Sequence, residues 1–325
     1  MNIVNPANIR MWSMLGSRGT FGTCMLEVAK DNEKVIALAA DLTTTAGLDR
    51  FRKEFPDRMI NTGIAEQNMI GMASAFANEG YVPFAVSFAN FSTLRACETV
   101  RHFLGYMHCN VKLVGLSAGF AMGMFGNTHY GMEDMGVIRT IPGITILSPA
   151  DCTEVVKATE AAARFNGPVY IRLTGIMNNP VVYKEDYTFE IGKAISLLKG
   201  SDVTIITTGT MVYNAIKAAA LLKEKGISAG VIDMHTIKPL DVEIIKNEAI
   251  SSKLIVTVEE HSKINGLGGA VAEYLSTFSC HPALLKIGID DNFKHAGDYK
   301  FMLSQNGLLP EQIAVSIEKK MTTII

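Results

Sequence analysis

The chain has 325 residues, of which 48% are hydrophobic and 19% charged, a composition typical of a folded protein and not of a disordered one. A formal net charge of −2, with lysines and arginines scattered along the sequence, argues against a nucleic-acid-binding protein. The first 20 residues lack the pattern of a secretion signal, and no apolar run is long enough for a membrane helix. We therefore expect a soluble, cytoplasmic protein with no membrane or nucleic-acid partner.

Short apolar runs alternate with helical patterns in the first half of the chain. Such runs, bounded by turn residues, predict buried parallel strands at 35–40, 81–88, 111–118, 144–150 and 168–173. Apolar residues at helical spacing follow Glu66, and the amphipathic stretch 152–165 has Asp151 as its expected N-cap. This alternation predicts the α/β fold class with a mostly parallel sheet.

A polar, irregular stretch at 175–193 is expected to be a linker to a second, smaller α/β unit. That unit has predicted strands at 203–209, 228–234 and 253–260, and predicted helices at 211–226 and 265–275. We place the boundary near residue 187, which divides the chain into domains 1–187 and 188–325.

The cysteines and two of the histidines give no sign of a metal site. The five cysteines are widely spaced, without a Cys-x-x-Cys pair, and are expected to be free thiols in a reducing compartment. His102 and His108 are six residues apart, a spacing that does not place two ligands on one helix face. We expect no metal ligands in this chain.

Four loops at predicted strand ends carry residues that suit catalysis, because reactive groups in open α/β sheets lie at the carboxyl ends of strands. Asp41 follows one strand, Glu66 begins a helix, Phe88 and Phe91 lie at a strand-to-helix junction, and His129 lies in the glycine- and methionine-rich loop "AGFAMGMFGNTHYGM". Each residue alone has an ordinary structural role, such as a cap, a charge at the helix macrodipole or core packing. Their joint order indicates an active site.

Two long segments carry a family resemblance. The segments "GIAEQNMIGMASAFANEGYVPFAVSFANF" and "GNTHYGMEDMGVIRTIPGITILSPAD" resemble the pyrimidine-binding domain of transketolases, and "VTVEEHSKINGLGGAVAEYL" resembles their C-terminal domain. The likeness covers nearly the whole chain. It implies a thiamine-diphosphate-binding, pyrimidine-type domain followed by a smaller transketolase C-terminal-like domain.

The resemblance also implies which residues hold the cofactor. Glu66 matches the catalytic glutamate that hydrogen-bonds the pyrimidine ring nitrogen and favours the imino tautomer of thiamine diphosphate. Phe88 and Phe91 match the aromatic pair that stacks on the pyrimidine. Asp41 matches an acidic residue beside the thiazolium cation, and its neighbour Leu42 is expected in the same cofactor site.

The expected substrate site departs from the family pattern. His129 matches the catalytic histidine that hydrogen-bonds the sugar hydroxyl and the developing alkoxide. The family usually binds the sugar phosphate through a histidine and an arginine, and the matching positions here are Ser117 and Gly175. The family's acidic E-D pair is replaced here by Met124 and Phe125. The resemblance therefore predicts substrate contacts from Arg18, Thr45, Ser117, Met124, Phe125 and His129. We expect an apolar channel of Met122, Met124 and Phe125, and an acceptor that is a deoxy, branched or nucleotide-linked sugar or ketone.

One part of the family's cofactor site is missing from this sequence. Transketolases bind the diphosphate and a divalent metal, Mg²⁺ or Ca²⁺, through a G-D-G segment and a later asparagine in a separate N-terminal domain, and no G-D-G occurs here. The glycines at 266–269 open a helix instead. The chain therefore resembles the C-terminal subunit of a split transketolase, active only with an N-terminal-type partner and paired with a second copy about a two-fold axis.

The predicted activity is transfer of a two-carbon ketol or acyl unit between small carbonyl compounds. A 2-oxo acid dehydrogenase β subunit has the same architecture and chain length, but the "GIAEQN" and "EEH" segments favour a transketolase. A deoxyxylulose phosphate synthase-like activity is related. A non-catalytic interaction subunit is a third alternative, against which the retained residues at the expected site argue.

Overall fold

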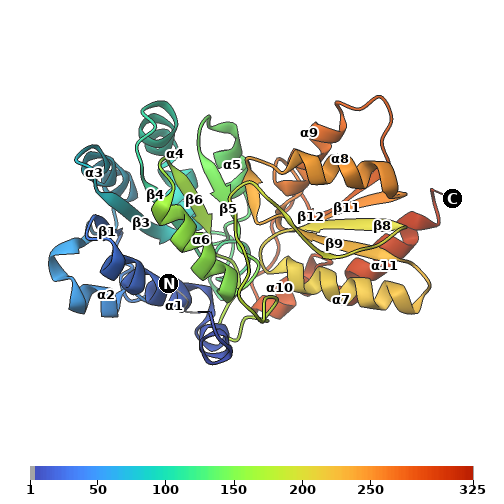
Figure 1. Cartoon of the computed structure of the whole chain (residues 1–325), viewed down its shortest axis with the longest axis horizontal. Helices are drawn as coiled ribbons and strands as arrows, with labels where there is room; N and C mark the ends of the chain where they lie inside the picture. Colours follow the sequence, from blue (N-terminus) through green and yellow to red (C-terminus); the bar gives the residue numbers. More distant parts are fainter. Residues whose placement is uncertain (1–3, 325) are drawn as a thin grey trace.

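The computed structural model describes residues 4–324. They form two β-sheets, each covered by helices, that lie side by side (Figure 1). The first sheet has seven strands in the order β10-β5-β6-β4-β3-β1-β2. These strands are β1 (Val35–Ala39), β2 (Met59–Asn61), β3 (Val82–Phe88), β4 (Lys112–Leu116), β5 (Thr145–Leu147), β6 (Val169–Arg172) and β10 (Thr236–Lys238). All neighbours are parallel except β10, which runs antiparallel to β5.

Helices cover both faces of the first sheet, which explains why its central strands are buried apolar runs. One face packs on α3 (Glu66–Asn78), α4 (Cys97–Val100) and α5 (Asp134–Thr140). The other packs on α1 (Pro6–Asp31), α2 (Asp49–Glu54) and α6 (Cys152–Arg164). The predicted N-cap of α6 is confirmed, because Asp151 Oδ1 accepts a hydrogen bond from the backbone N–H of Glu154 at 2.9 Å.

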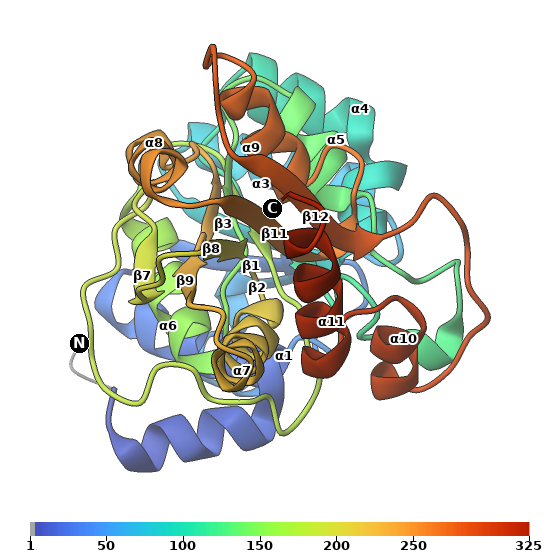
Figure 2. The same cartoon turned by 90° about the vertical axis from the view of Figure 1, so that its right-hand side faces the viewer.

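The second sheet has five strands in the order β12-β11-β8-β9-β7, parallel except for the β7–β9 pair. In Figure 2 the side of the molecule that holds this sheet faces the viewer, and helices lie on each side of the sheet. Its strands are β7 (Ile195–Leu198), β8 (Val203–Thr207), β9 (Ala229–Asp233), β11 (Leu254–Ser262) and β12 (Ala283–Ile289). Its helices are α7 (Met211–Glu224) and α11 (Pro310–Met321) on one face, with α10 (Tyr299–Gln305) beside them, and α8 (Val242–Ser251) and α9 (Leu267–Leu275) on the other.

The two sheets are joined by an irregular segment and by a shared core. Residues 173–194 contain no helix or strand, as the sequence predicted for the linker. Ile206 of β8 and Ile232 of β9 belong to the same apolar cluster as Met135 and Ile138 of α5. The five cysteines are unpaired. No helix among the described residues has the length and apolar character needed to cross a membrane.

Candidate active site

Glu66 is a buried carboxylate at the carboxyl edge of the first sheet. It is the first residue of α3, and its side chain is 2% exposed. Its Oε1 atom accepts a hydrogen bond from Ser87 Oγ at 3.0 Å, and its Oε2 atom accepts one from Arg95 Nη1 at 3.1 Å. Sequence reasoning identified neither donor. Ser87 was detectable in principle, because it immediately precedes Phe88 in a strand predicted to enter the site.

Four aromatic rings pack against one another near the donor Arg95, whose guanidinium carbon lies 4.1 Å from the centroid of one of them, Phe91. They are Phe88 at the end of β3, Phe91 at the start of a π-helix, η2 (Phe91–Arg95), Phe125 and His129. The ring centroid of His129 lies 5.4 Å from that of Phe91, 6.1 Å from that of Phe88 and 5.2 Å from that of Phe125. The loop of His129, far along the sequence, thus closes over the phenylalanine pair.

Asp41 lies in the loop directly after β1, in a left-handed conformation with φ of 58°. Its backbone N–H donates to Asn61 Oδ1 at 3.0 Å, and Asn61 Nδ2 donates to Asp41 Oδ1 at 3.1 Å. The Asp41 side chain is exposed, and Leu42 beside it is half-buried. Asn61, which the sequence did not single out, therefore sets the direction of the Asp41 carboxylate.

The His129 loop is fastened at its base by the second domain. Gly119 and Gly131 form a β-bridge that closes the loop. The backbone N–H of Phe120 donates to Glu260 Oε1 at 2.6 Å, and Arg172 Nη2 donates to the carbonyl oxygens of Gly131 and Glu260, each at 2.9 Å. Both ends of the loop therefore depend on residues buried at the domain junction.

Glu260 is satisfied on both carboxylate oxygens, since Tyr299 Oη and Thr210 Oγ1 donate to Oε2 at 2.6 and 2.9 Å. Burial raises the pKa of Glu260, while these hydrogen bonds oppose the shift. Arg172 also pairs with Asp134, at 2.8 Å from Nε to Oδ2, inside a fully buried pair. The junction is therefore a connected polar network, which holds the loop more firmly than separate contacts would.

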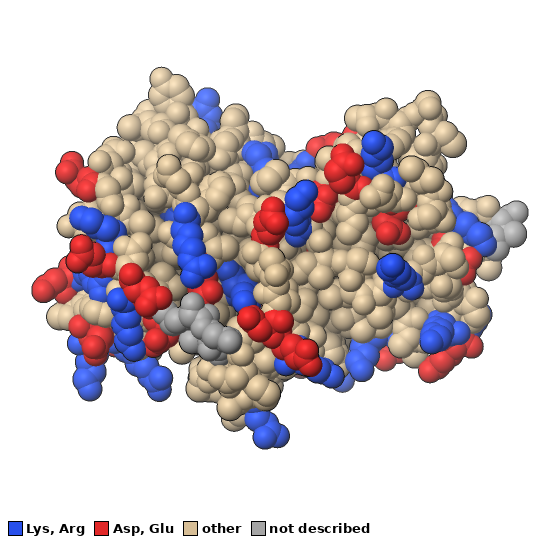
Figure 3. All heavy atoms as spheres, in the orientation of Figure 1, with Lys and Arg blue, Asp and Glu red and all other residues tan. Residues whose placement is uncertain are grey.

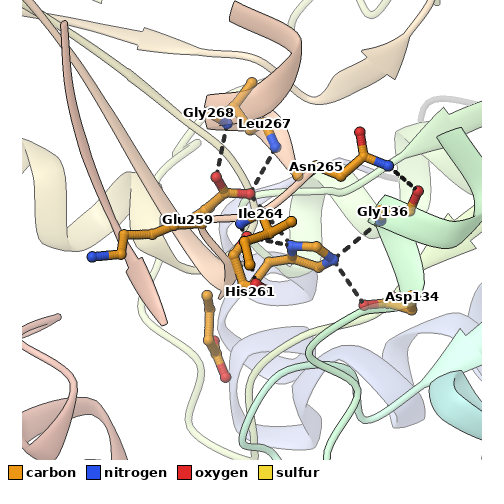
Figure 4. Close-up of polar contacts among 12 residues, drawn as sticks. Asp134, Gly136, Glu259, His261, Ile264, Asn265, Leu267 and Gly268 are labelled. Atoms are coloured by element: carbon orange, nitrogen blue, oxygen red, sulfur yellow. Dashed lines mark hydrogen bonds and ion pairs between the residues drawn. The ribbon is translucent and has the colours of Figure 1, made fainter. Parts of the chain in front are cut away.

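Figure 4 shows the neighbouring part of this junction, around His261. The ring Nε2 accepts a hydrogen bond from the Gly136 N–H at 3.2 Å, and Nδ1 lies 2.8 Å from the Ser262 carbonyl oxygen. Burial lowers the pKa of His261 to about 4, so the imidazole is neutral and donates through Nδ1. Glu259 accepts the N–H groups of Leu267 and Gly268 at the start of α9, each at 2.7 Å.

A cavity of about 530 Å³ lies at the same junction. Its lining includes Gly136, Ile264, Asn265 and Phe293, and none of the predicted site residues. The residues predicted to bind cofactor and substrate instead lie at the open carboxyl edge of the first sheet.

The structure separates the predicted substrate residues into buried and exposed ones. Ser117 is buried at the end of β4, while Arg18 and Thr45 are half-buried. Met124 and Phe125, on the short helix η4 (Gly123–Phe125), are 74% and 62% exposed, so they line an open surface of the free chain. The ring of Phe125 packs against that of His129. The backbone of Arg18 lies against Gly47, near the loop that holds Thr45.

The chain is similar to known proteins over nearly its whole length. Residues 13–177 match the transketolase pyrimidine-binding domain and residues 192–313 the transketolase C-terminal domain. A subunit of an apulose-4-phosphate transketolase from Phocaeicola vulgatus is 39% identical, covering 89% of this chain and 92% of its own. A 6-deoxy-6-sulfo-D-fructose transketolase subunit from Clostridium sp. is 38% identical, covering 91% of each. A solved split gene transketolase, an inactive β4 tetramer, is 37% identical, with a TM-score of 0.86 over 95% of this chain and 99% of its own.

Proposed function

This chain belongs to the transketolase family as the C-terminal subunit of a split transketolase, and we propose that it transfers a two-carbon ketol or acyl unit to a carbonyl acceptor together with an N-terminal-type partner. The observation that carries the proposal is that Arg95 contacts both the buried Glu66 and the Phe91 ring, against which His129 also packs. Glu66, Phe91 and His129 thus place a carboxyl group, a stacking surface and a hydrogen-bond donor at one sheet edge.

The residues present fit the pyrimidine half of thiamine diphosphate. Phe88 and Phe91 offer ring faces for stacking, and Glu66 offers a carboxyl group that Arg95 connects to the Phe91 face. When bound, the cofactor would supply a nucleophilic thiazolium carbon that cleaves the bond next to a ketose carbonyl. Glu66 would hold a proton at the pyrimidine ring nitrogen, and Asp41 would stabilise the positive charge of the thiazolium, with Leu42 in the same cofactor site.

His129 is suited to bind the oxygen on which negative charge develops. Thr128 Oγ1 lies 2.9 Å from His129 Nδ1. If the hydroxyl donates to Nδ1, the proton stays on Nε2, which becomes the donor for the substrate hydroxyl or alkoxide. The anchored loop would keep this donor in place without reorganisation.

We assign the diphosphate and its metal ion, Mg²⁺ or Ca²⁺, to the partner subunit. Within residues 4–324, no group of three His, Cys, Asp or Glu side chains is arranged to hold a metal ion. The partner would carry the G-D-G segment and the later asparagine of the family. The composite site would then form only where the two chains meet.

The acceptor is proposed not to be an ordinary sugar phosphate. Ser117 is buried and uncharged where the family has a phosphate ligand, and Met124 and Phe125 present apolar surface beside His129. Arg18 and Thr45 would remain as polar contacts for the substrate. Two related subunits are named for apulose 4-phosphate and 6-deoxy-6-sulfo-D-fructose, so relatives of this chain act on sugars other than xylulose 5-phosphate and ribose 5-phosphate. Efficient turnover of xylulose 5-phosphate with ribose 5-phosphate would contradict the proposal.

Two copies of this chain are expected to pair about a two-fold axis. The surface over α3, α4 and α5 is largely free of charged side chains in Figure 3. Leu94, Tyr106 and Met107, in the segments that flank α4, are 42%, 83% and 46% exposed. A related chain forms an inactive β4 tetramer, which supports self-association through an apolar surface of this kind.

The test is ketol transfer by the assembled enzyme with Glu66→Gln. Because glutamine keeps the shape but not the titrating proton, kcat should fall by about 10² or more. Glu79→Gln, at the exposed end of the same helix, is the matched control and should leave kcat unchanged. An unchanged rate in Glu66→Gln would favour a non-catalytic subunit, and decarboxylation of a 2-oxo acid by the wild-type complex would favour the dehydrogenase alternative.

A further inference from the structure

Arg95 makes two contacts with the residues assigned to the pyrimidine. Its guanidinium carbon lies 4.1 Å from the ring centroid of Phe91. Its Nη1 atom donates to Glu66 Oε2 at 3.1 Å. A planar, cationic group thus stacks on the aromatic surface and hydrogen-bonds the buried carboxylate at the same time.

An aminopyrimidine ring would need the same two surfaces. A ring that stacks on Phe91 and hydrogen-bonds Glu66 must lie where the guanidinium of Arg95 now lies, because one group already fills the space between them. We propose that Arg95 is a built-in occupant of the pyrimidine site in the free chain, and that it must leave before the cofactor binds. This inference rests on the proposed function.

The physical reason for such an occupant is the burial of Glu66. A buried carboxylate is costly unless both oxygens have partners. Ser87 serves Oε1, and in the free chain Arg95 alone among the described residues donates to Oε2. Arg95 therefore stabilises the unassembled subunit at the expense of cofactor affinity.

Arg95 is also placed so that it can leave. Its side chain is 48% exposed, and it is the last residue of the π-helix η2, a helix type often found at functional sites. The other contact at this residue is from Gln67 Nε2 to its backbone carbonyl oxygen, at 3.4 Å, and it does not hold the guanidinium. Rotation of the side chain would uncover Phe91 and Glu66 without moving the helix.

The inference is tested with the isolated chain and the pyrimidine half of the cofactor, 4-amino-5-hydroxymethyl-2-methylpyrimidine, by calorimetric titration. Arg95→Met removes the competing cation and should lower the dissociation constant by about fivefold to tenfold, as expected for loss of a half-exposed ion pair and cation–π contact. Arg95→Lys keeps the charge but not the planar stack, so its dissociation constant should lie between those of the wild type and Arg95→Met. An unchanged or raised dissociation constant in Arg95→Met would overturn the inference.

Arg52→Met is the matched control, because Arg52 is 59% exposed and forms a single ion pair with Asp49 at 3.0 Å, outside the site. It should bind the pyrimidine as the wild type does. The same variants, assembled with the partner, are then titrated with thiamine diphosphate, and thermal unfolding checks that each is folded. Wild-type binding without a gain in Arg95→Met would overturn this inference alone, whereas no binding by the wild-type complex would overturn the proposed function and the inference with it.

Discussion

Ser87 is the residue that fixes the direction of the Glu66 carboxylate without itself reaching a ligand. It is fully buried in β3, and its hydroxyl donates to Glu66 Oε1 at 3.0 Å. Since Arg95 is expected to leave on cofactor binding, Ser87 would become the remaining protein donor to this carboxylate. Ser87→Ala should therefore lower kcat of the assembled enzyme by about tenfold to a hundredfold, since a hydrogen bond to a charged group contributes about 1.5 to 3 kcal/mol.

Steady-state kinetics with Ser92→Ala provides the control for Ser87→Ala. Ser92 is equally buried, and its hydroxyl donates to the Phe88 carbonyl oxygen at 3.0 Å, not to Glu66. The two variants remove the same atom from the same region. Equal losses in both would mean that the effect comes from packing and not from the carboxylate.

Some residues of the candidate site can be identified from sequence, and others cannot. Asp41, Glu66, Phe88 and His129 follow predicted strands or open predicted helices, so their positions at the sheet edge follow from the α/β pattern. Arg95 reaches Glu66 because η2 is a π-helix, whose wider turn changes which side chains share a face. No pattern of apolar residues reveals that change. The roles of Asp41, Glu66, Phe88 and His129 toward cofactor and substrate stay predictions.

At the scale of elements, the His129 loop depends on Gly119. Its φ is +65°, and a Cβ atom there would lie 2.2 Å from Glu260 Oε1. Gly119→Ala should therefore displace the carboxylate that holds the Phe120 N–H. We expect a raised KM for the sugar acceptor and a loss of about 2 to 4 kcal/mol in the free energy of unfolding, from backbone strain together with the disturbed buried network.

Gly80→Ala separates these two contributions. Gly80 also has a positive φ, of +82°, but a Cβ atom there would meet nothing within 4 Å. This variant should lose only about 1 to 2 kcal/mol in urea unfolding and keep its KM. If Gly119→Ala behaved in the same way, Glu260 would have no part in positioning the loop.

The elements that the sequence predicted well are the buried strands, because a short, continuous apolar run between turn residues is typical of a strand covered on both faces. The strands β2 and β10 were not predicted, because their three residues do not form a continuous buried apolar run. The 26-residue helix α1 was not predicted. It is kinked at Gly16, where φ is +73°, and buries residues on several sides, so its apolar residues do not form one stripe.

At the scale of the whole molecule, the chain crosses between its two sheets. β10 follows β9 of the second sheet, beyond the boundary predicted near residue 187, yet it pairs with β5 of the first. For a strand of three residues, the sequence does not indicate which strand it pairs with or whether the pair is parallel. This pairing and the shared apolar cluster bind the two domains together, which supports the view that the second domain positions the His129 loop.

A cluster of buried acids also spans the two domains, beside the connecting segment. Asp233 ends β9, and its Oδ2 accepts the hydroxyl of Tyr183 at 2.7 Å, whereas Oδ1 has no partner among the described residues. Glu154 of α6 accepts the hydroxyl of Tyr187 at 2.8 Å, and Asp151 accepts the N–H of Tyr183 at 2.8 Å. Burial raises the pKa of Glu154, and the charge of Asp233 raises it further.

This cluster should make stability depend on pH. Burial raises the pKa of Asp233 from 3.8 to about 7, so the folded state holds the proton more tightly than the unfolded state. The stabilisation is complete below pH 3.8 and is lost as the pH rises through about 7.

Asp233→Asn removes this titration and keeps the shape of the side chain. From about pH 5.5 to about pH 8.5, the Tm of the wild type should therefore fall relative to that of Asp233→Asn and then level off above the folded pKa. Its free energy of unfolding drops by at most about 1.4 kcal/mol per pH unit. His235 and His261, whose pKa values burial lowers to about 4, and Glu259, whose pKa burial raises to about 7, are common to both proteins and cancel in the difference. Glu154, whose pKa the charge of Asp233 raises, titrates together with Asp233 and contributes to the difference. Parallel Tm curves would show that Asp233 keeps one charge state across this range and that the domain junction does not respond to pH through it.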